Sequence, residues 1–392
     1  MRPVVLLLAL TITGCQQATG PSDLNPSAKW SSPVALFGIS GRLAAGTKLH
    51  AVGSDGGGIQ HRSSSDEGAT WSASTPIPGA GPDLPLYGAL AVQGSTVHLL
   101  TRSGASLRMQ RSLDGGATWS AGTTLTGYTA DGGERVQIAT DGNYVHVFLG
   151  RAGAVPDNTF KNYYWRSPDQ GQTWSGVRIL DDPTGPPSPG GIAAENGTVH
   201  IAYAAILPGV GSLGHRARYL RSTDNGATWS PPVDVSGGST RPQIRPRPRV
   251  VNGRVIVIWE EPLDHNPLGP FPNATRGQIR ANRSLDNGSS WQGTFDVSAV
   301  SGVYPNHPEI AVGPGGQVHV IYRLSKDQAT LSTSDVVAYR HSTDYGATWS
   351  TQETAVAIPG VETHPYNAVT TGSFVHLMVG GTRFYHVRRS LP

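Results

Sequence analysis

Three short Pro-containing segments in the second half of the sequence carry residue types suited to acid–base chemistry and ion binding. They are 247–249, 307–309 and 364–366, which read Arg-Pro-Arg, His-Pro-Glu and His-Pro-Tyr. A Glu beside a Tyr can form an activated pair for nucleophilic attack. If the three segments begin equivalent strands, Arg249 (or Arg247), Glu309 and Tyr366 approach one another. The alternative is that such polar residues only line a wet channel.

Further candidates surround these segments. Arg241 and Arg245 extend the basic patch, and arginine forks suit carboxylate ligands. The run Glu-Glu-Pro-Leu-Asp-His at 260–265 follows an apolar strand-like run and is expected to open the longest loop, 260–277, although it also fits a solvated acidic loop. The candidate catalytic residues are Tyr366, Glu309, Glu260 and Asp264. The candidate ligand-binding residues are Arg241, Arg245, Arg247, Arg249, Glu261, His307 and His364.

A repeated turn, Ser-x-Asp-x-Gly-x-Thr/Ser-Trp, dictates how these residues must be positioned. It occurs six times, with its aspartates at Asp66, Asp114, Asp169, Asp224, Asp286 and Asp344. The Asp and hydroxyl groups can bond backbone groups inside the turn, Gly supplies a positive φ, and Trp offers a large apolar surface to bury. A turn repeated in every module cannot be one active site. We therefore expect these aspartates to be structural.

A second repeat sets the number of modules. A strand-like run, usually ending in Val-His, occurs seven times, from Lys48-Leu49-His50 to Phe374-Val375-His376, and no helical periodicity lies between the copies. The repeated turn, called a box below, has no seventh copy; Trp30, whose surroundings parallel those of Trp229, corresponds to the Trp of that missing copy. The pattern predicts an all-β propeller of four-stranded antiparallel blades, with seven blades favoured and six the alternative. The N-terminal strand is expected to complete the C-terminal blade.

The six boxes resemble the Asp boxes of the sialidase-like, or BNR-repeat, β-propeller superfamily, over nearly all of the mature chain. The resemblance implies a propeller and suggests an exo-acting sialidase, with an arginine clamp, a Tyr nucleophile paired with Glu, and an Asp acid. Propellers with such boxes also include proteins that are not sialidases. The family's early Phe/Tyr-Arg-Ile-Pro motif is absent, and the region before the first box offers only Gly41-Arg42-Leu43.

The N-terminus predicts export and anchoring. Residues 1–14 read as a signal peptide, and the small residues before Cys15, the only cysteine of the 392 residues, resemble a bacterial lipoprotein signal with Cys15 lipidated. An ordinary signal peptide is the alternative. Residues 15–29 then form a flexible tether and 30–392 a single propeller domain. The chain is expected to be exported and anchored in the cell envelope, periplasmic or at the surface, by its lipid alone.

The composition of the chain limits the classes of ligand that we expect it to bind. The net charge is +3 and 15% of residues are charged, so nucleic acid is not an expected ligand. No Cys/His cluster suggests zinc; no cofactor is expected, and a structural calcium ion at an Asp-rich turn stays open. Two functions remain: a monomeric glycan-directed protein, including an exo-glycosidase of sialidase type, or a non-catalytic propeller that binds a glycan, a peptide or an envelope protein, or scaffolds an assembly.

Overall fold

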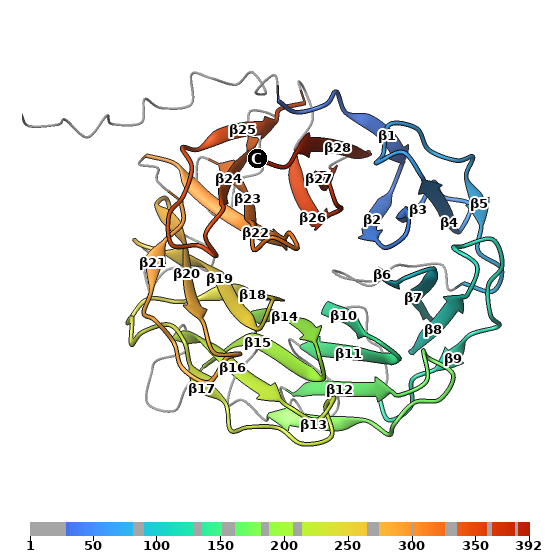
Figure 1. The fold of residues 1–392 in the computed structure, drawn as a ribbon, viewed down its shortest axis with the longest axis horizontal. Helices are drawn as coiled ribbons and strands as arrows, with labels where there is room; N and C mark the ends of the chain where they lie inside the picture. The colour runs from blue at the N-terminus through green and yellow to red at the C-terminus, as the bar shows by residue number, and fades with distance from the viewer. Residues whose placement is uncertain are drawn as a thin grey trace, which may run out of the picture.

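The computed structural model describes residues 29–80, 90–128, 135–150, 161–181, 188–206, 214–264, 274–298, 302–325, 335–358, 363–380 and 383–392. They form seven four-stranded antiparallel sheets arranged as blades around one axis (Figure 1), so the seven-bladed prediction is confirmed. Within the described residues, every regular element is a strand. No helix among them is long and apolar enough to cross a membrane.

Each blade runs from an inner strand at the axis to an outer strand at the rim. The first three blades are blade 1, β2 (Ser40–Ala45), β3 (Leu49–Ser54), β4 (Ile59–Ser64) and β5 (Thr75–Pro76); blade 2, β6 (Leu90–Gln93), β7 (Thr96–Ser103), β8 (Ser106–Ser112) and β9 (Thr123–Thr124); and blade 3, β10 (Arg135–Asp141), β11 (Tyr144–Gly150), β12 (Asn162–Ser167) and β13 (Arg178–Asp181).

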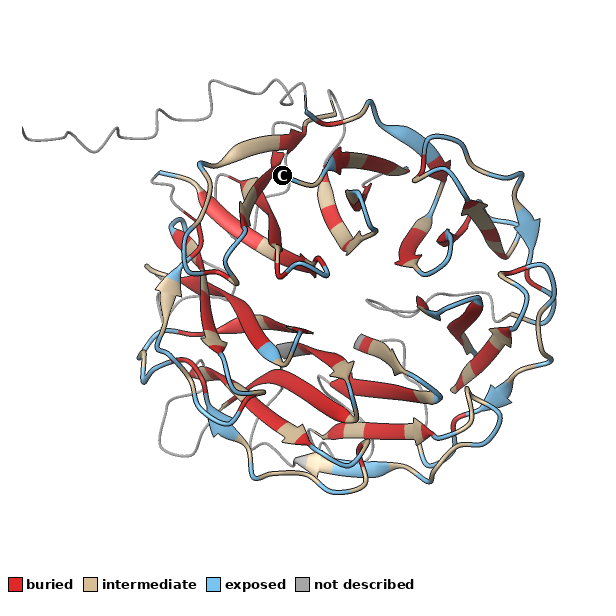
Figure 2. Cartoon of the chain, in the orientation of Figure 1, coloured by how far each residue is buried: buried red, intermediate tan, exposed pale blue. Residues whose placement is uncertain are grey.

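The next three continue the ring in chain order. They are blade 4, β14 (Ser188–Glu195), β15 (Thr198–Ile206), β16 (His215–Ser222) and β17 (Val233–Asp234); blade 5, β18 (Ile244–Val251), β19 (Arg254–Pro262), β20 (Gly277–Ser284) and β21 (Phe295–Asp296); and blade 6, β22 (Tyr304–Val312), β23 (Val318–Ser325), β24 (Val336–Ser342) and β25 (Glu353–Val356). The second strands are buried along most of their length, whereas most outer strands are exposed or half-buried (Figure 2).

Blade 7 joins the two ends of the chain. Its inner strands are β26 (His364–Thr370), β27 (Phe374–Gly380) and β28 (Phe384–Ser390), and its outer strand is the N-terminal β1 (Val34–Phe37). Trp30 adds a bridge to Arg389 just before β1. The predicted closure by the N-terminal strand is therefore confirmed. This closure gives the N-terminal strand a partner in β28 and completes the seventh blade with four strands.

The repeated boxes are tight turns held by their own side chains. In the blade 4 box, Asp224 accepts hydrogen bonds from the Ser222 hydroxyl (2.6 Å), the Thr228 amide (2.8 Å) and the Thr228 hydroxyl (2.6 Å). These bonds lower the pKa of Asp224, so its carboxylate stays ionised. The same bonds recur in the other five boxes. All six aspartates therefore accept hydrogen bonds within their own turns and have a structural role.

Each box also docks onto the preceding blade. The Tyr219 hydroxyl of blade 4 lies 2.7 Å from His200 Nδ1, and the Tyr219 ring meets Trp291 of the blade 5 box edge-on at 4.8 Å between centroids. The Tyr164 ring meets Trp229 in the same way, and histidine rings replace tyrosine in front of Trp119 and Trp71. The repeated histidines therefore pack at the interfaces between blades, and all but His98 also form a hydrogen bond through Nδ1.

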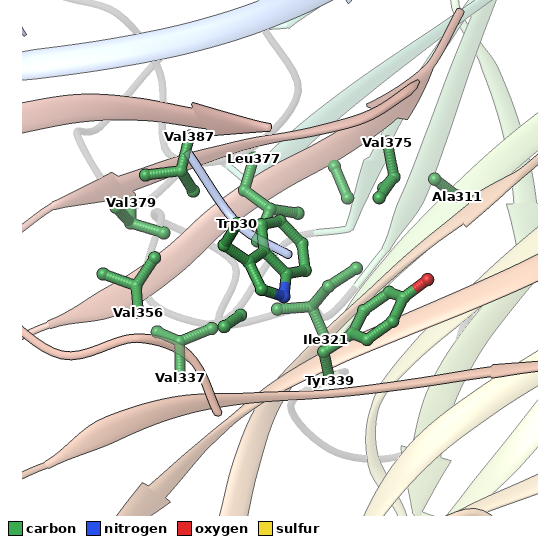
Figure 3. Close-up of a cluster of buried hydrophobic side chains, with 12 residues drawn as sticks. Trp30, Ala311, Ile321, Val337, Tyr339, Val356, Val375, Leu377, Val379 and Val387 are labelled. Atoms are coloured by element: carbon green, nitrogen blue, oxygen red, sulfur yellow. The ribbon is translucent and has the colours of Figure 1, made fainter. Parts of the chain in front are cut away.

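Blade 7 lacks a box, and Trp30 takes its place. Its indole meets the Tyr339 ring of blade 6 edge-on at 5.2 Å and is surrounded by valines and leucines of blades 6 and 7 (Figure 3). This is the contact that Trp229 makes with Tyr164 between blades 3 and 4. The correspondence of Trp30 with a box Trp, inferred from the sequence, is thus a structural equivalence.

In most blades an arginine side chain donates a hydrogen bond to a backbone carbonyl of the next box. Arg166 donates to the Asn225 carbonyl at 3.2 Å, and Arg221 donates to the Asn287 carbonyl at 2.8 Å. Arg388 bonds the Asp66 carbonyl at 3.0 Å and so ties blade 7 to blade 1. In blade 6 the position equivalent to these arginines is His341, which pairs opposite His319. The next blade, blade 7, has no box to which an arginine could bond. The box thus adds hydrogen bonds and ring contacts to the packing between blades.

Replacing the box glycine by alanine should destabilise the fold through a steric clash, in addition to the cost of placing alanine at a positive φ. Gly288 has φ +81°, and a Cβ there would lie 1.9 Å from the Tyr219 hydroxyl oxygen, whereas Gly253 has φ +68° with nothing within 4 Å. Gly288→Ala should destabilise by about 1–3 kcal/mol more than Gly253→Ala, because only the former overpacks an interface. Equal free energies of unfolding for the two variants, measured in denaturant, would refute the docking role.

Candidate functional site

The axis of the ring contains a cavity of about 290 Å³, near the lower end of small-molecule sites. Inner-strand residues of all seven blades line it, and most are Ala, Val, Leu or Ile. The charged and aromatic lining residues are Arg249, Glu309 and Tyr366, from blades 5, 6 and 7. The structure thus brings together the three residues that the sequence grouped at the axis.

Glu309 lies between two arginines. Its Oε1 is 3.4 Å from Arg247 Nε, and both side chains are almost completely buried. The Arg247 Nη1 also donates to the Gly190 carbonyl of blade 4 at 3.1 Å, so Arg247 spans three blades. Burial lowers the pKa of Arg249, and Glu309 offsets part of that shift. Arg247, Arg249 and Glu309 together carry one excess positive charge at the cavity, whose other lining residues are mostly apolar.

The strand register corrects how the three segments correspond. Arg247 pairs opposite Ile258, and Glu309 pairs opposite Ile321 in the next blade. The segment equivalent to 307–309 is therefore 245–247 in blade 5, not 247–249. In blade 7 it is 365–367, not 364–366, because Asn367 pairs opposite Met378, which corresponds to Ile321. The segments 245–247 and 307–309 each contain a β-bulge, in which Arg245 and His307 adopt φ of +56° and +50°. A left-handed conformation costs a non-glycine residue roughly 1–2 kcal/mol.

Glu260 connects the two bulges. It belongs to β19, which runs through Pro262, so the prediction that residue 260 opens a loop is wrong. Its fully buried carboxylate accepts hydrogen bonds from Arg245 Nη1 (2.7 Å), the Tyr304 hydroxyl (2.8 Å) and the His307 amide (3.2 Å). Burial and this carboxylate raise the pKa of Tyr304, which keeps it a neutral donor. With these donors, Glu260 acts as a structural anion rather than an acid facing the cavity.

The other residues of the predicted acidic loop lie away from the cavity lining. Glu261 is fully buried and lies 3.4 Å from Gln243 Nε2, 3.4 Å from Gln278 Nε2 and 3.5 Å from Arg280 Nη1. Arg241 is half exposed and 4.0 Å from the same carboxylate. Asp264 accepts bonds from the amides of Thr275 and Arg276, which hold the chain on either side of the segment 265–273, outside the described residues.

Histidine and tyrosine rings continue the site across blades 6 and 7. The His307 and His364 rings lie 5.2 Å apart, and His364 lies 6.2 Å from Tyr366. Burial, followed by the charges of Arg245, His364, Arg323 and Arg247, holds the pKa of His307 well below its usual range. His307 is therefore neutral at pH 7. Its surroundings disfavour a cation and suit a neutral or anionic ligand.

Arg42, which is not one of the candidate site residues from the sequence, contacts a residue of the cavity wall. It lies on β2 of blade 1, and its guanidinium carbon is 5.3 Å from the centre of the Tyr366 ring, which also contacts Phe384 at 4.6 Å. Asn367, next to Tyr366, exchanges two hydrogen bonds with the Leu43 backbone. These contacts span 324 residues of sequence, so only the closure of the ring could have revealed them.

The arrangement can bind a small polar ligand but lacks a second acid on the described cavity wall. Of its described lining residues, Glu309 is the carboxylate, and retaining or inverting hydrolysis of the common type needs two. Tyr366 lines the same cavity and offers a phenolic hydroxyl. Among the described residues, no group of three or more His, Cys, Asp or Glu side chains is placed to hold a metal ion.

No family model and no curated protein matches this chain. Solved structures with a similar fold include a protein of unknown function from Dyadobacter fermentans (13% identical, 93% of this chain and 100% of that one, TM-score 0.54). Another is an ulvan lyase bound to a disaccharide of glucuronic acid and sulfated rhamnose (12%, 80% and 86%, 0.52). A third is an α-L-arabinofuranosidase from Fusarium graminearum with an iminosugar inhibitor (13%, 92% and 98%, 0.50). At these identities the similarity shows a shared propeller fold.

Proposed function

We propose that this protein is an exported, envelope-anchored propeller that recognises glycans in its axial cavity. The observation that carries the proposal is the convergence of Arg249, Glu309 and Tyr366 on one cavity wall. An arginine and a carboxylate are complementary to sugar hydroxyls and acidic groups, and an aromatic ring suits a sugar face. Two propellers of similar fold, the ulvan lyase and the arabinofuranosidase, were solved with a saccharide or an iminosugar, which supports the same ligand class.

Binding to a glycan array tests this function. The wild-type protein should bind a defined subset of glycans, and Arg249→Gln should weaken the best of these by about tenfold or more, since a charged hydrogen bond contributes about 1.5–3 kcal/mol. Arg254→Gln is the matched control, because Arg254 packs on Tyr345 outside the cavity. If the two variants bind alike, the axial cavity is not the site.

Hydrolysis of exo-sialidase type is a second candidate, favoured by Tyr366 and Glu309 sharing the cavity wall. The wild-type protein should then turn over a fluorogenic sialoside or a member of a broader glycoside panel, and Tyr366→Phe should abolish turnover while glycan binding persists. Retained glycan binding without turnover of any substrate would support the purely binding function. A peptide or envelope-protein ligand would be indicated by the absence of glycan binding.

The anchor makes a separate prediction. Cys15 lies outside the described residues and is the single cysteine of the sequence, so it is the proposed lipidation site. In a bacterial host, metabolic labelling with a palmitate analogue should label the wild-type protein, and Cys15→Ala should abolish the label and release the propeller from membranes. Labelling that persists in Cys15→Ala would reject this anchor, and a chain cleaved but unlabelled would indicate an ordinary signal peptide.

A further inference from the structure

Two residues of the inner strands hold an unusual backbone conformation. Nine non-glycine residues among those described have positive φ. Seven of them lie in box turns or hairpin turns, namely Glu67, Gln170, Asn196, Asn225, Asn252, Asn287 and Tyr345. The remaining two, Arg245 and His307, lie at the bulges of β18 and β22. Such residues persist only where their surroundings hold them, and they gather at functional sites.

Both of these residues bond the same buried carboxylate. Glu260 accepts from the Arg245 side chain at 2.7 Å and from the His307 backbone amide at 3.2 Å. Tyr304, at the start of β22, supplies a third bond at 2.8 Å. The carboxylate is fully buried. A buried anion with three such donors couples the two strands, because moving either one leaves a charge unsatisfied.

The bulges decide where the site residues point. In each strand the residue two positions further along is the one that forms the ion pair: Arg247 after Arg245, and Glu309 after His307. A bulge re-aims the side chains that follow it. We propose that Glu260 is a positioning residue, which holds both bulges and thereby sets the distance between Arg247 and Glu309. The binding readout of this inference rests on the proposed function, whereas its geometric readout does not.

The test compares Glu260 with a carboxylate that has a similar task elsewhere. Glu195 accepts the amides of Asn252 (3.0 Å) and Gly253 (2.7 Å), and so ties blade 4 to the β18–β19 turn at the other end of the strands. Crystal structures of Glu260→Gln and Glu195→Gln are compared with the wild type. Glu260→Gln should lengthen the separation of Arg247 Nε and Glu309 Oε1 beyond hydrogen-bonding distance. Glu195→Gln should leave it unchanged.

Affinity and rescue distinguish positioning from a general loss of stability. For the glycan that the wild-type protein binds best on the array, Glu260→Gln should lower affinity by about tenfold, and Glu195→Gln by less than about twofold. Adding His307→Gly to Glu260→Gln should restore the ion pair, because glycine accepts the left-handed conformation without support. A Glu260→Gln structure that keeps the 3.4 Å pair overturns the inference. If the wild-type protein binds no glycan, the proposed function fails and the two crystal structures alone decide this inference.

Discussion

Lowering the pH from about 7.5 to about 5 is expected to remove most of the stability of the propeller. Eight histidines at the blade interfaces are buried, and burial lowers the pKa of each from 6.5 to about 4 or about 3; they are His50, His61, His98, His146, His200, His319, His376 and His386. Between pH 6.5 and 4 the unfolded chain therefore binds protons that the folded chain does not. The free energy of unfolding must fall as the pH falls through this window.

The size of the effect comes from the number of histidines. At pH 5 each contributes a loss on the order of 1 kcal/mol, and eight such losses are comparable with the whole stability of a typical domain. The box aspartates do not contribute there, because the pKa of Asp66 is lowered from 3.8 and it protonates only at lower pH. Guanidine unfolding at about pH 7.5, 6 and 5 measures the loss. A free energy of unfolding that stays constant over this range would contradict the account.

His98 offers a matched variant for this experiment. It is buried, and its ring nitrogens have no hydrogen-bond partner among the residues that the structure describes. Blade 5 carries Ile256 at the equivalent position. His98→Ile removes one titrating group without breaking a side-chain bond. It should leave the stability at pH 7.5 intact and reduce the acid-induced loss by about one histidine's share. An unchanged pH dependence would show that His98 does not titrate as the structure indicates.

Breaking the Arg247–Glu309 pair is expected to cost about 3 kcal/mol, the second large effect. Arg247→Met leaves the Glu309 carboxylate buried without the guanidinium that lies 3.4 Å away. The charge of Arg249 remains close, which places the cost at the lower end of the usual 3–5 kcal/mol. The double variant Arg247→Met with Glu309→Leu removes both charges and should recover most of the lost stability.

The double variant also separates stability from binding. It should fold about as stably as the wild-type protein, yet bind the array-selected glycan at least about tenfold more weakly, because two polar groups of the site are gone. Equilibrium unfolding and calorimetric titration of the two variants measure both quantities. A cost below about 1 kcal/mol for Arg247→Met would mean that the pair is solvated, in conflict with its burial.

The sequence was sufficient to predict the ring but not the details of its centre. The boxes and the seven-fold strand repeat report local structure, and Trp30 revealed which strand completes blade 7. The bulges at Arg245 and His307 are invisible in such a pattern, because Arg-Pro repeats twice in blade 5 and both registers look alike. The sequence pattern therefore predicts 247–249 as the counterpart of 307–309, whereas the strand register gives 245–247.

Two further features depend on long-range packing. Glu260 and Glu261 read as a polar loop, but their charges are satisfied by Arg245, Tyr304 and Arg280, which lets β19 extend through them. Arg42 lies beside Tyr366 only because the chain closes into a ring. Neither the burial of a paired charge nor a contact across the closure leaves a local sequence signal.

The most direct test of the account is a crystal structure of the protein with the glycan that it binds best on the array. We expect one sugar unit in the axial cavity, in contact with Arg249, Glu309 and Tyr366, and with Arg42 and His364 nearby. Glycan density on the outer rim of the blades, with the axial cavity empty at saturating ligand, would contradict the assignment of the site.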